Sequence, residues 1–489
     1  MSRRTLLAGA ATGATTVWLG AAFPTGSTAA RRKDPWRRAL RELDEVILRG
    51  MDEYAVPGCA VGLVLGDRTY VRGYGVTNVD DPTPVDGDTV FRVGSTTKTF
   101  TGTAVMRLVE QGLVDLDAAV RTYLPEFTTA DPTVGAQVTV RQLLNHSPGW
   151  LGDYFEDFGA GDDALARYVA GMARLPQLTP LGTTFAYNNA AVATAGRIVE
   201  VVTRSTYEDA VRRLVIEPLG LNHSRLFTDE IIGFNVAASH TDRDGTPVVV
   251  PEYWYQPRSY KPTGGLISSA ADQLRWARFH LGDGRAPSGQ RLLSTAALRE
   301  MQTRPGPGGS LVVELTGMGV TWMQRPTAEG VTVLQHGGSY PGQYSGFLLV
   351  PRRRFGLTLL TNADGGAVMR DALFTDDWAL RRFAGVRNLP ARPQRRGATA
   401  LAAFAGTYRS TQIIESGEEV GLEINLRASN GRLRATGATS AAGYAFYAED
   451  RVLDLDGAGD PAGARSDFVR GPDGSVAFLR THGRLWRRA

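Results

Sequence analysis

The stretch FRVGSTTKTF places Ser95 three residues before Lys98 at the start of a predicted helix. Of the 54 basic residues in the chain only three are lysines: Lys33, Lys98 and Lys261. Arginine stays protonated at any pH that a protein survives, whereas a desolvated lysine amine can lose its proton. Residues three apart on a helix share a face, so Lys98 can approach Ser95. A neutral amine there can accept the hydroxyl proton, and the pair predicts a nucleophilic serine.

Two further segments carry side chains suited to the same chemistry. In FAYNNAAVATAGRI, Tyr187 precedes two asparagines just before a predicted helix, and in VTVLQHGGS, His336 precedes two glycines at the end of a predicted strand. Each segment also has a purely structural interpretation, because Ser95 or an asparagine can cap a helix and His336 can be an ordinary strand residue. A lysine in the first helical turn opposes the helix dipole, which argues against a structural role for Lys98.

The order S-x-x-K, Y-x-N and H-x-G, at these spacings, resembles the penicillin-recognising serine hydrolases: class C β-lactamases, DD-peptidases and related esterases. The resemblance covers roughly residues 36 to 385 and includes LLNHSPGW, PTGGLISSAADQLRWARF and YSGFLLVPRRRFGLTLLTNAD. The nearest subgroup has histidine in place of the usual lysine of the K-T-G motif. The resemblance implies that Ser95 is the acylated nucleophile, that Lys98 takes its proton, and that Tyr187 relays this proton to the leaving group. It also implies that Asn189 binds the substrate amide or carbonyl.

The histidine motif supplies the rest of the predicted site. By the same resemblance His336 is a fourth catalytic residue, and the backbone N–H groups of Ser95 and Ser339 form the oxyanion hole. Gly337 and Gly338 let an extended substrate lie close against the strand edge. Histidine has an unperturbed pKa of ~6.5, so it is a poor fixed cation for a substrate carboxylate at neutral pH. This substitution weakens the case for efficient β-lactamase activity.

Other chemistries lack their signatures. KPTGG at residues 261–265 mimics a K-T-G motif, but a proline interrupts it and the segment suits a turn leading into a helix. The chain has no S-D-N triplet, no G-x-S-x-G elbow and no H-E-x-x-H, and its six histidines are dispersed. No phosphate-binding loop or dinucleotide fingerprint is present. We therefore expect no metal and no cofactor.

Hydrophobic periodicity predicts the elements that position these residues. Helical spacing over residues 35–53 precedes a β-hairpin made of CAVGLVL and TYVRGYGV, and a second hairpin of SGFLLV and FGLTLLTN flanks PRRR. Residues 115–330 are predicted to be mainly helical. If the two hairpins share one antiparallel sheet, the middle of the chain is a helical insertion. We therefore expect an α/β (α+β) hydrolase domain over residues 35–386, with an antiparallel sheet flanked by helices and an inserted helical subdomain.

The C-terminal part has a different character. Residues 387–400 form a proline- and arginine-rich linker without periodicity, and residues 401–489 show alternating strands with Asn-Gly and Asp-Gly turns. We expect a small all-β barrel or sandwich, lipocalin-like, whose role the sequence does not indicate. The single cysteine, Cys59, lies in a predicted buried strand, so no intrachain disulfide can form.

The N-terminus resembles a twin-arginine export signal. Arg3 and Arg4 precede an alanine- and glycine-rich apolar run, and residues 1–30 end in the small residues STAA. We expect cleavage near residue 29 or 30 and an extracytoplasmic protein. The alternative, an uncleaved anchor, is disfavoured because about 18 residues so rich in Ala, Gly and Thr make a poor span compared with the ~20 apolar residues usually needed. The net charge of +4 is too small to indicate nucleic-acid binding.

These features predict an exported serine hydrolase that acts on D-amino-acid peptides or peptidoglycan-type amides, as a carboxypeptidase or aminopeptidase. Its partner is then a small-molecule or peptide substrate. An esterase or β-lactamase of the same family, or transfer of the acyl group to an amine, stays open. So does a penicillin-binding sensor without turnover, or an adhesin-like protein whose cleft is a relic. The sequence does not indicate the oligomeric state.

Overall fold

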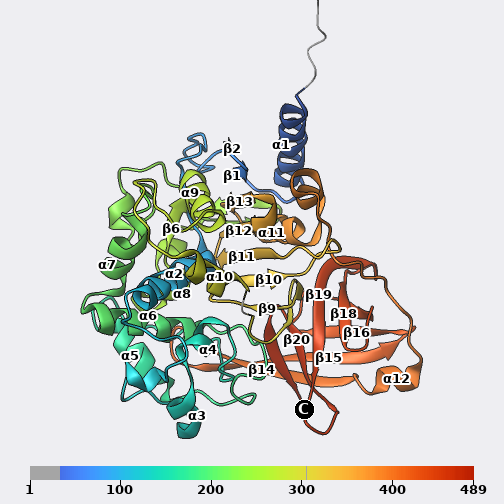
Figure 1. Ribbon diagram of the computed structural model, residues 1–489. Helices are drawn as coiled ribbons and strands as arrows, with labels where there is room; N and C mark the ends of the chain where they lie inside the picture. Colours follow the sequence, from blue (N-terminus) through green and yellow to red (C-terminus); the bar gives the residue numbers. More distant parts are fainter. Residues whose placement is uncertain (1–33, 304) are drawn as a thin grey trace, which may run out of the picture.

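A seven-stranded antiparallel sheet forms the centre of the larger domain in the computed structural model, which describes residues 34–303 and 305–489 (Figure 1). The predicted signal at residues 1–30 lies outside these described residues. Strand order across the sheet is β2-β1-β13-β12-β11-β10-β9. The strands are β1 (Gly58–Leu65), β2 (Arg68–Gly75), β9 (Gly317–Met318), β10 (Met323–Arg325), β11 (Val333–Tyr340), β12 (Gln343–Val350) and β13 (Phe355–Thr361). Because β1 pairs with β13, the early and late hairpins share one sheet as predicted.

Helices cover both faces of this sheet, and the alternation of β1 shows which face meets which helix. Cys59 and Val61 pack in a cluster with Leu43 and Ile47 of α1, whereas Ala60 and Val64 belong to the cluster on the opposite face. Strand side chains alternate between faces, so β1 is buried on both sides. The helices are α1 (Pro35–Glu53), α2 (Thr97–Glu110), α3 (Pro132–Gln137), α4 (Val140–Leu144), α5 (Ala164–Gly171), α6 (Asn189–Thr203), α7 (Tyr207–Val211), α8 (Lys261–Gly264), α9 (Ala270–Leu281), α10 (Thr295–Thr303), α11 (Gly366–Thr375) and α12 (Ala398–Ala402).

The segment predicted to be mainly helical, residues 115–330, also contains strands. Its β9 and β10 extend the central sheet, and β6 pairs with β3 next to the serine turn. Strands of two to four residues are too short to show a period-2 pattern, which explains why periodicity missed them. The short strands outside the central sheet are β3 (Val90–Arg92), β4 (His240–Arg243), β5 (Thr246–Val249), β6 (Ile267–Ser269), β7 (Gly309–Leu311) and β8 (Val313–Leu315).

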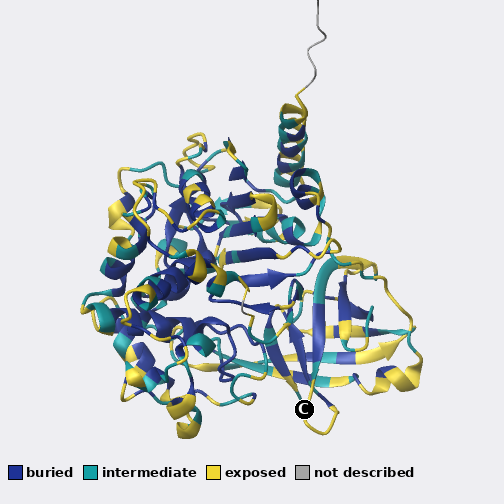
Figure 2. Ribbon diagram, viewed as in Figure 1, coloured by how far each residue is buried: buried dark blue, intermediate teal, exposed yellow. Residues whose placement is uncertain are grey.

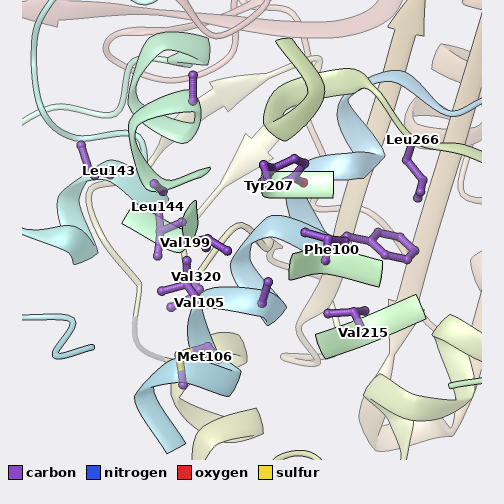
Figure 3. Close-up of a cluster of buried hydrophobic side chains, with 14 of the residues drawn as sticks. Phe100, Val105, Met106, Leu143, Leu144, Val199, Tyr207, Val215, Leu266 and Val320 are labelled. Carbon is purple, nitrogen blue, oxygen red and sulfur yellow. The ribbon is translucent and has the colours of Figure 1, made fainter. Parts of the chain in front are cut away.

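Helix α2 is buried on nearly all sides although its sequence is rich in threonine. Its Thr99 and Thr103 hydroxyls donate to carbonyl oxygens one turn earlier, at 2.7 and 2.8 Å, so burial leaves them satisfied. Phe100 stacks on Trp276 of α9 with ring centroids 4.0 Å apart. Figure 3 shows Phe100 and Val105 among side chains from neighbouring segments. The helix that carries Lys98 and follows the Ser95 turn is therefore a fixed part of the core.

The C-terminal domain is a closed eight-stranded barrel, which is one of the two all-β folds predicted for it; the other was a sandwich. Pairing of β14 with β21 closes it, and its interior is apolar and aromatic. Figure 2 shows the buried inner residues of the central sheet and of the barrel against an exposed exterior. The strands are β14 (Gly406–Ile413), β15 (Glu419–Ser429), β16 (Arg432–Gly437), β17 (Gly443–Phe446), β18 (Arg451–Leu455), β19 (Pro461–Arg470), β20 (Val476–Thr481) and β21 (Arg484–Arg488).

A buried ion pair joins the barrel to the larger domain. Arg480 of β20 donates to both carboxylate oxygens of Asp467 and, at 2.6 Å, to the carbonyl oxygen of Phe185. The Asp467 carboxylate also accepts from the hydroxyl of Ser310 in the larger domain. The side chains of Arg480 and Asp467 are 5% and 12% exposed, so each charge compensates for the water that the other has lost.

None of the helices in the described part of the chain has both the length and the hydropathy needed to cross a bilayer.

We predict that Arg480→Met lowers the free energy of unfolding by about 3–5 kcal/mol, because it leaves the Asp467 carboxylate buried without a cation. Calorimetry of the purified protein measures the effect as a lower unfolding midpoint. Arg409→Met is the matched control, since it breaks an exposed barrel ion pair with Glu423 and is expected to change the midpoint little. Equal midpoints for the two variants would show that the buried pair does not hold the domains together.

Candidate active site

Ser95 and Lys98 meet as predicted at the N-terminus of α2. Ser95 lies in the 3₁₀ turn Gly94–Thr96, half-buried, and the Nζ of Lys98 is 3.0 Å from its Oγ. The Lys98 amine also donates to the carbonyl oxygen of Thr263 at 2.7 Å. Thr263 belongs to the KPTGG segment. This segment forms the short helix α8 and not a K-T-G strand, and its backbone orients the Lys98 side chain.

The Lys98 amine is in an environment that favours its neutral form. The side chain is fully buried, and this desolvation lowers the pKa of Lys98 well below its usual value. The positive charge of Arg484 lowers this pKa further, and the negative charge of Asp153 opposes the shift. A neutral amine has two N–H groups and one lone pair. With one N–H directed to Thr263, the lone pair can accept the hydroxyl proton of Ser95.

Tyr187 lies against both members of this pair. Its hydroxyl lies close enough to Ser95 for the serine to influence its pKa, and the Lys98 Nζ is 5.0 Å from the centre of its ring. Burial raises the pKa of Tyr187 to about 12, although Ser95 and Arg484 act in the opposite direction. The phenol is therefore protonated at neutral pH. Its hydroxyl can relay a proton, but the side chain is not a permanently deprotonated tyrosinate that could act as the general base.

His146 supports Tyr187 from behind and was not predicted as a site residue, although LLNHSPGW contains it. Its ring stacks on the Tyr187 ring with centroids 4.6 Å apart, and its Nδ1 accepts from the backbone N–H of Asn188 at 2.9 Å. This bond places the ring proton on Nε2. Burial and the nearby Lys98 keep the pKa of His146 well below its usual value, so the ring is neutral and acts as packing.

The two asparagines after Tyr187 have different places. Asn188 caps α6, its side-chain oxygen accepting from Ala191 N–H at 2.8 Å, which is the structural role considered for either residue. Asn189 begins the helix, lines the cavity at Ser95, and donates its amide to Asp153 Oδ1 at 3.0 Å. The structure thus brings Asn189 to the predicted wall, and its binding of substrate stays a prediction.

His336 lies on β11 with its ring 6.2 Å from that of Tyr187. Its Nδ1 is 2.7 Å from the carbonyl oxygen of Gly337, which places a proton on Nδ1, and its buried Nε2 has no hydrogen-bond partner among the described residues. Burial, with a smaller effect of Lys98, lowers the pKa of His336 to about 3. The imidazole is therefore uncharged from mildly acidic to alkaline pH, and it cannot be the cation that lysine provides in a K-T-G motif.

The serine turn and the glycines of β11 are in close backbone contact. A Cβ atom on Gly338 would lie 1.8 Å from the carbonyl oxygen of Val93, and one on Gly94 would lie 2.8 Å from the backbone nitrogen of Ser339. Gly94 has φ +48°, which favours glycine. Only glycine permits this approach, and it brings the backbone of Gly94, the residue before Ser95, against Ser339. The oxyanion hole formed by the N–H groups of Ser95 and Ser339 stays a prediction.

A cavity of about 420 Å³ opens over Ser95. The larger domain contributes Tyr187, Asn189, Gly337 and Ser339 to its wall, and all four are predicted site residues. The barrel contributes three residues that sequence reasoning missed: Glu415, His482 and Arg484. Across the described ranges, no cluster of three or more His, Cys, Asp or Glu side chains is arranged to hold a metal ion.

Arg484 is the barrel residue nearest the chemistry. Its guanidinium carbon is 4.7 Å from the centre of the Tyr187 ring, and its Nε donates to Asp153 Oδ2 at 3.0 Å. The turn before it is also in contact, because the carbonyl oxygen of Gly483 accepts from the backbone N–H of Tyr187 at 2.8 Å. No local pattern distinguishes Arg484 from the many other arginines, so only the folded structure reveals its place.

Arg370 of α11 lies on the opposite side of the strand edge. It donates at 3.0 Å to the carbonyl oxygen of Gly338 and at 2.6 Å to the hydroxyl of Ser339, and it forms an ion pair with Asp371 at 2.7 Å. These bonds hold the part of β11 that carries the predicted oxyanion donor. Sequence reasoning also missed this residue.

Comparisons with known proteins agree with this geometry. A model of the Beta-lactamase family matches residues 43–381. Penicillin-binding protein 4 of Amycolatopsis lactamdurans is 38% identical over 362 residues, 73% of this chain and 94% of that protein. Unguisins hydrolase ungD of Aspergillus violaceofuscus is 26% identical over 454 residues, 81% and 78% of the two chains. The structure of SurE has a TM-score of 0.72 at 26% identity and covers 93% of this chain and 100% of its own, so the likeness includes the barrel. SurE has also been solved with D-Leu, with a TM-score of 0.70 at 24% identity and the same coverage.

We predict that Arg484→Met moves the acidic limb of Ser95 reactivity to higher pH. The reactive form of Lys98 is the neutral amine, which exists above its pKa. Removal of Arg484 takes away a charge that lowers this pKa and leaves Asp153, which raises it. The rate of Ser95 labelling by a fluorophosphonate, measured against pH, reports the limb. Arg484→Lys keeps the charge and should leave the limb near its wild-type position. A limb that is unchanged in Arg484→Met contradicts the electrostatic role.

Proposed function

Because the chain belongs to the Beta-lactamase family of serine hydrolases, we propose that it forms an acyl-enzyme on Ser95 and hydrolyses amide bonds of D-amino-acid peptides or peptidoglycan-type fragments. The observation that carries this proposal is the contact of 3.0 Å between the Ser95 hydroxyl and the fully buried Lys98 amine. A buried amine without an acidic partner is neutral at working pH, and only a neutral amine can activate the hydroxyl.

In the proposed reaction, Ser95 Oγ attacks the carbonyl carbon while its proton moves to Lys98 Nζ. The carbonyl oxygen becomes an oxyanion that the N–H groups of Ser95 and Ser339 stabilise. When the C–N bond breaks, the proton passes from Lys98 through the Tyr187 hydroxyl to the leaving amine, as a phenol that stays protonated permits. Water then attacks the ester carbon, gives its proton to the same relay, and regenerates the Ser95 hydroxyl.

Two observations support the substrate ranking. His336 is uncharged at neutral pH, which disfavours a β-lactam carboxylate at the position that a fixed cation serves in a K-T-G enzyme. A relative with 38% identity is a penicillin-binding protein, and SurE, a protein of this fold, has been solved with D-Leu. We rank D-peptides first, esters second and β-lactams third. Transfer of the acyl group to an amine in place of water uses the same intermediate.

We further propose that the protein is exported through the twin-arginine route, because Arg3 and Arg4 precede an apolar run at the N-terminus. This route carries folded proteins, which suits a two-domain chain with a single cysteine.

We predict that replacing both Arg3 and Arg4 with lysine retains the protein in the cytoplasm of a bacterial host, because a receptor of this kind reads the arginine pair and not its charge. Immunoblots of the cytoplasmic and external fractions measure this. Secretion of the lysine variant at the wild-type level would rule out the twin-arginine route.

We predict that Lys98→Arg abolishes acylation, with a loss of at least about 10³-fold in rate, although positive charge is kept, because arginine cannot become the neutral acceptor. Mass spectrometry of the Ser95 adduct and its time course measure acylation, with Ser95→Ala as the control that cannot be labelled. Near wild-type acylation by the arginine variant would refute the role of Lys98.

The substrate class is tested by turnover of matched D- and L-peptides, p-nitrophenyl esters and a chromogenic cephalosporin. The proposal requires many product molecules per protein and a preference for D-peptides. A stable adduct with one equivalent of product identifies instead a non-turnover penicillin-binding protein. Faster ester turnover with no D-peptide cleavage identifies an esterase.

A further inference from the structure

The barrel places a carboxylate, Glu415, in the wall of the cavity that contains Ser95. This residue lies in the turn between β14 and β15. In the part of the chain that the structure describes, its carboxylate forms no ion pair and no side-chain hydrogen bond. Glu415 therefore faces the cavity as a charge without a protein partner.

The other ionised side chains in the cavity wall have ion-pair partners, which makes Glu415 distinctive. Arg370 is paired with Asp371 at 2.7 Å, and Arg484 is paired with Asp153 at 3.0 Å. Burial lowers the pKa of His482, which disfavours its charged form. Glu415, an exposed residue, is therefore the ionised group of the described lining that has no ion-pair partner. Behind the lining, the guanidinium carbon of Arg92 lies 4.7 Å from the centre of the Tyr340 ring. Close to the Glu415 carboxylate a cation is attracted and an anion is repelled.

The backbone fixes the position of Glu415. The carbonyl oxygen of Ile413 accepts from the backbone N–H of Phe155 at 2.7 Å, and that of Glu415 accepts from the N–H of Asp157 at 3.0 Å. The N–H of Ile413 donates in turn to the carbonyl oxygen of Asp153 at 2.9 Å. The turn thus pairs like an added strand with residues 153–157 of the larger domain, so the carboxylate is presented by a rigid element and not by a free loop.

Aromatic side chains surround this part of the cavity. Phe155, Tyr260 and Tyr340 line it, and the rings of Phe155 and Tyr260 meet edge to face at 5.9 Å. Burial, followed by the charge of Glu415, raises the pKa of Tyr260. Burial also raises the pKa of Tyr340, where the positive charge of Arg92 opposes the shift and Glu415 adds a smaller contribution to it. Tyr340 donates its hydroxyl to the carbonyl oxygen of Tyr255, whereas the buried Tyr260 hydroxyl has no partner among the described residues.

We propose that Glu415, Tyr260 and the rings of Phe155 and Tyr340 form a subsite for an ammonium group of the substrate. The carboxylate supplies the opposite charge, and the aromatic rings supply cation–π attraction, at Tyr340 from the face that Arg92 does not cover. This inference rests on the proposed function in that it takes the Ser95 cavity to be where the substrate binds. Of the possible amide substrates, it selects those that carry a primary amine, such as peptides with a free N-terminus or a basic side chain.

The test uses binding, so that it does not depend on turnover. D-Phenylalaninamide carries the ammonium group, and N-acetyl-D-phenylalaninamide is its neutral counterpart. Calorimetric titration of full-length Ser95→Ala, with and without Glu415→Gln, measures the affinity of both. The amine is expected to bind threefold to tenfold more weakly without the carboxylate, and the acetylated compound to change less than twofold. Glu418→Gln is the matched control, because this glutamate is exposed like Glu415 and lies in the same turn but does not line the cavity.

Three results would overturn the subsite: no binding of the amine to Ser95→Ala at 10 mM, an equal effect of Glu415→Gln on both compounds, or an equal effect of Glu418→Gln. Hydrolysis of D-peptides by the wild-type protein is measured separately. Glu415-dependent binding of the amine without hydrolysis sustains the subsite and defeats the proposed function. Hydrolysis with no Glu415 dependence defeats the subsite and sustains the function.

Discussion

Desolvation of one amine is the constraint on which the site depends. Lys98 is fully buried. Its amine is neutral because a charged ammonium group at that position would cost a large desolvation free energy. The rest of the local structure maintains that burial. Helix α2 satisfies its threonines internally, so no water is needed beside the lysine, and Thr263 provides a carbonyl in place of a counter-ion. A carboxylate in the same position would have produced an inert ion pair.

The barrel is a part of the site and not an appendage. Its last hairpin bonds to the backbone of Tyr187, its Arg484 lies over the Tyr187 ring, and its first turn carries Glu415 to the cavity. The larger domain supplies the bond-making groups, whereas the barrel supplies charges around them. This division explains how one catalytic arrangement can serve different substrates: the charges at the rim can change while Ser95 and Lys98 stay in place.

Much of the fold and the core of the site could be predicted from the sequence, for physical reasons. The pairing of Ser95 with Lys98 follows from helical spacing, and the shared sheet follows from two hairpins with clear alternation. The closure of the barrel and the strands β9 and β10 could not be predicted, because closure depends on long-range pairing and very short strands carry no periodicity. Arg484, Arg370 and Glu415 were missed since their importance comes only from what the fold brings beside them. The residue type alone indicates that His336 is a weak cation at neutral pH, but how far its pKa is lowered depends on its complete burial in the fold.

The long separation in sequence between Arg484 and Tyr187 also affects biosynthesis. Protein synthesis proceeds from the N-terminus, and domains fold as they emerge. The larger domain can therefore collapse around Lys98 while the final strand of the barrel is still on the ribosome. Until that strand is released, Tyr187 lacks its backbone partner and its neighbouring cation. The pocket of a nascent chain is thus complete only once β21 has been synthesised and has joined the barrel.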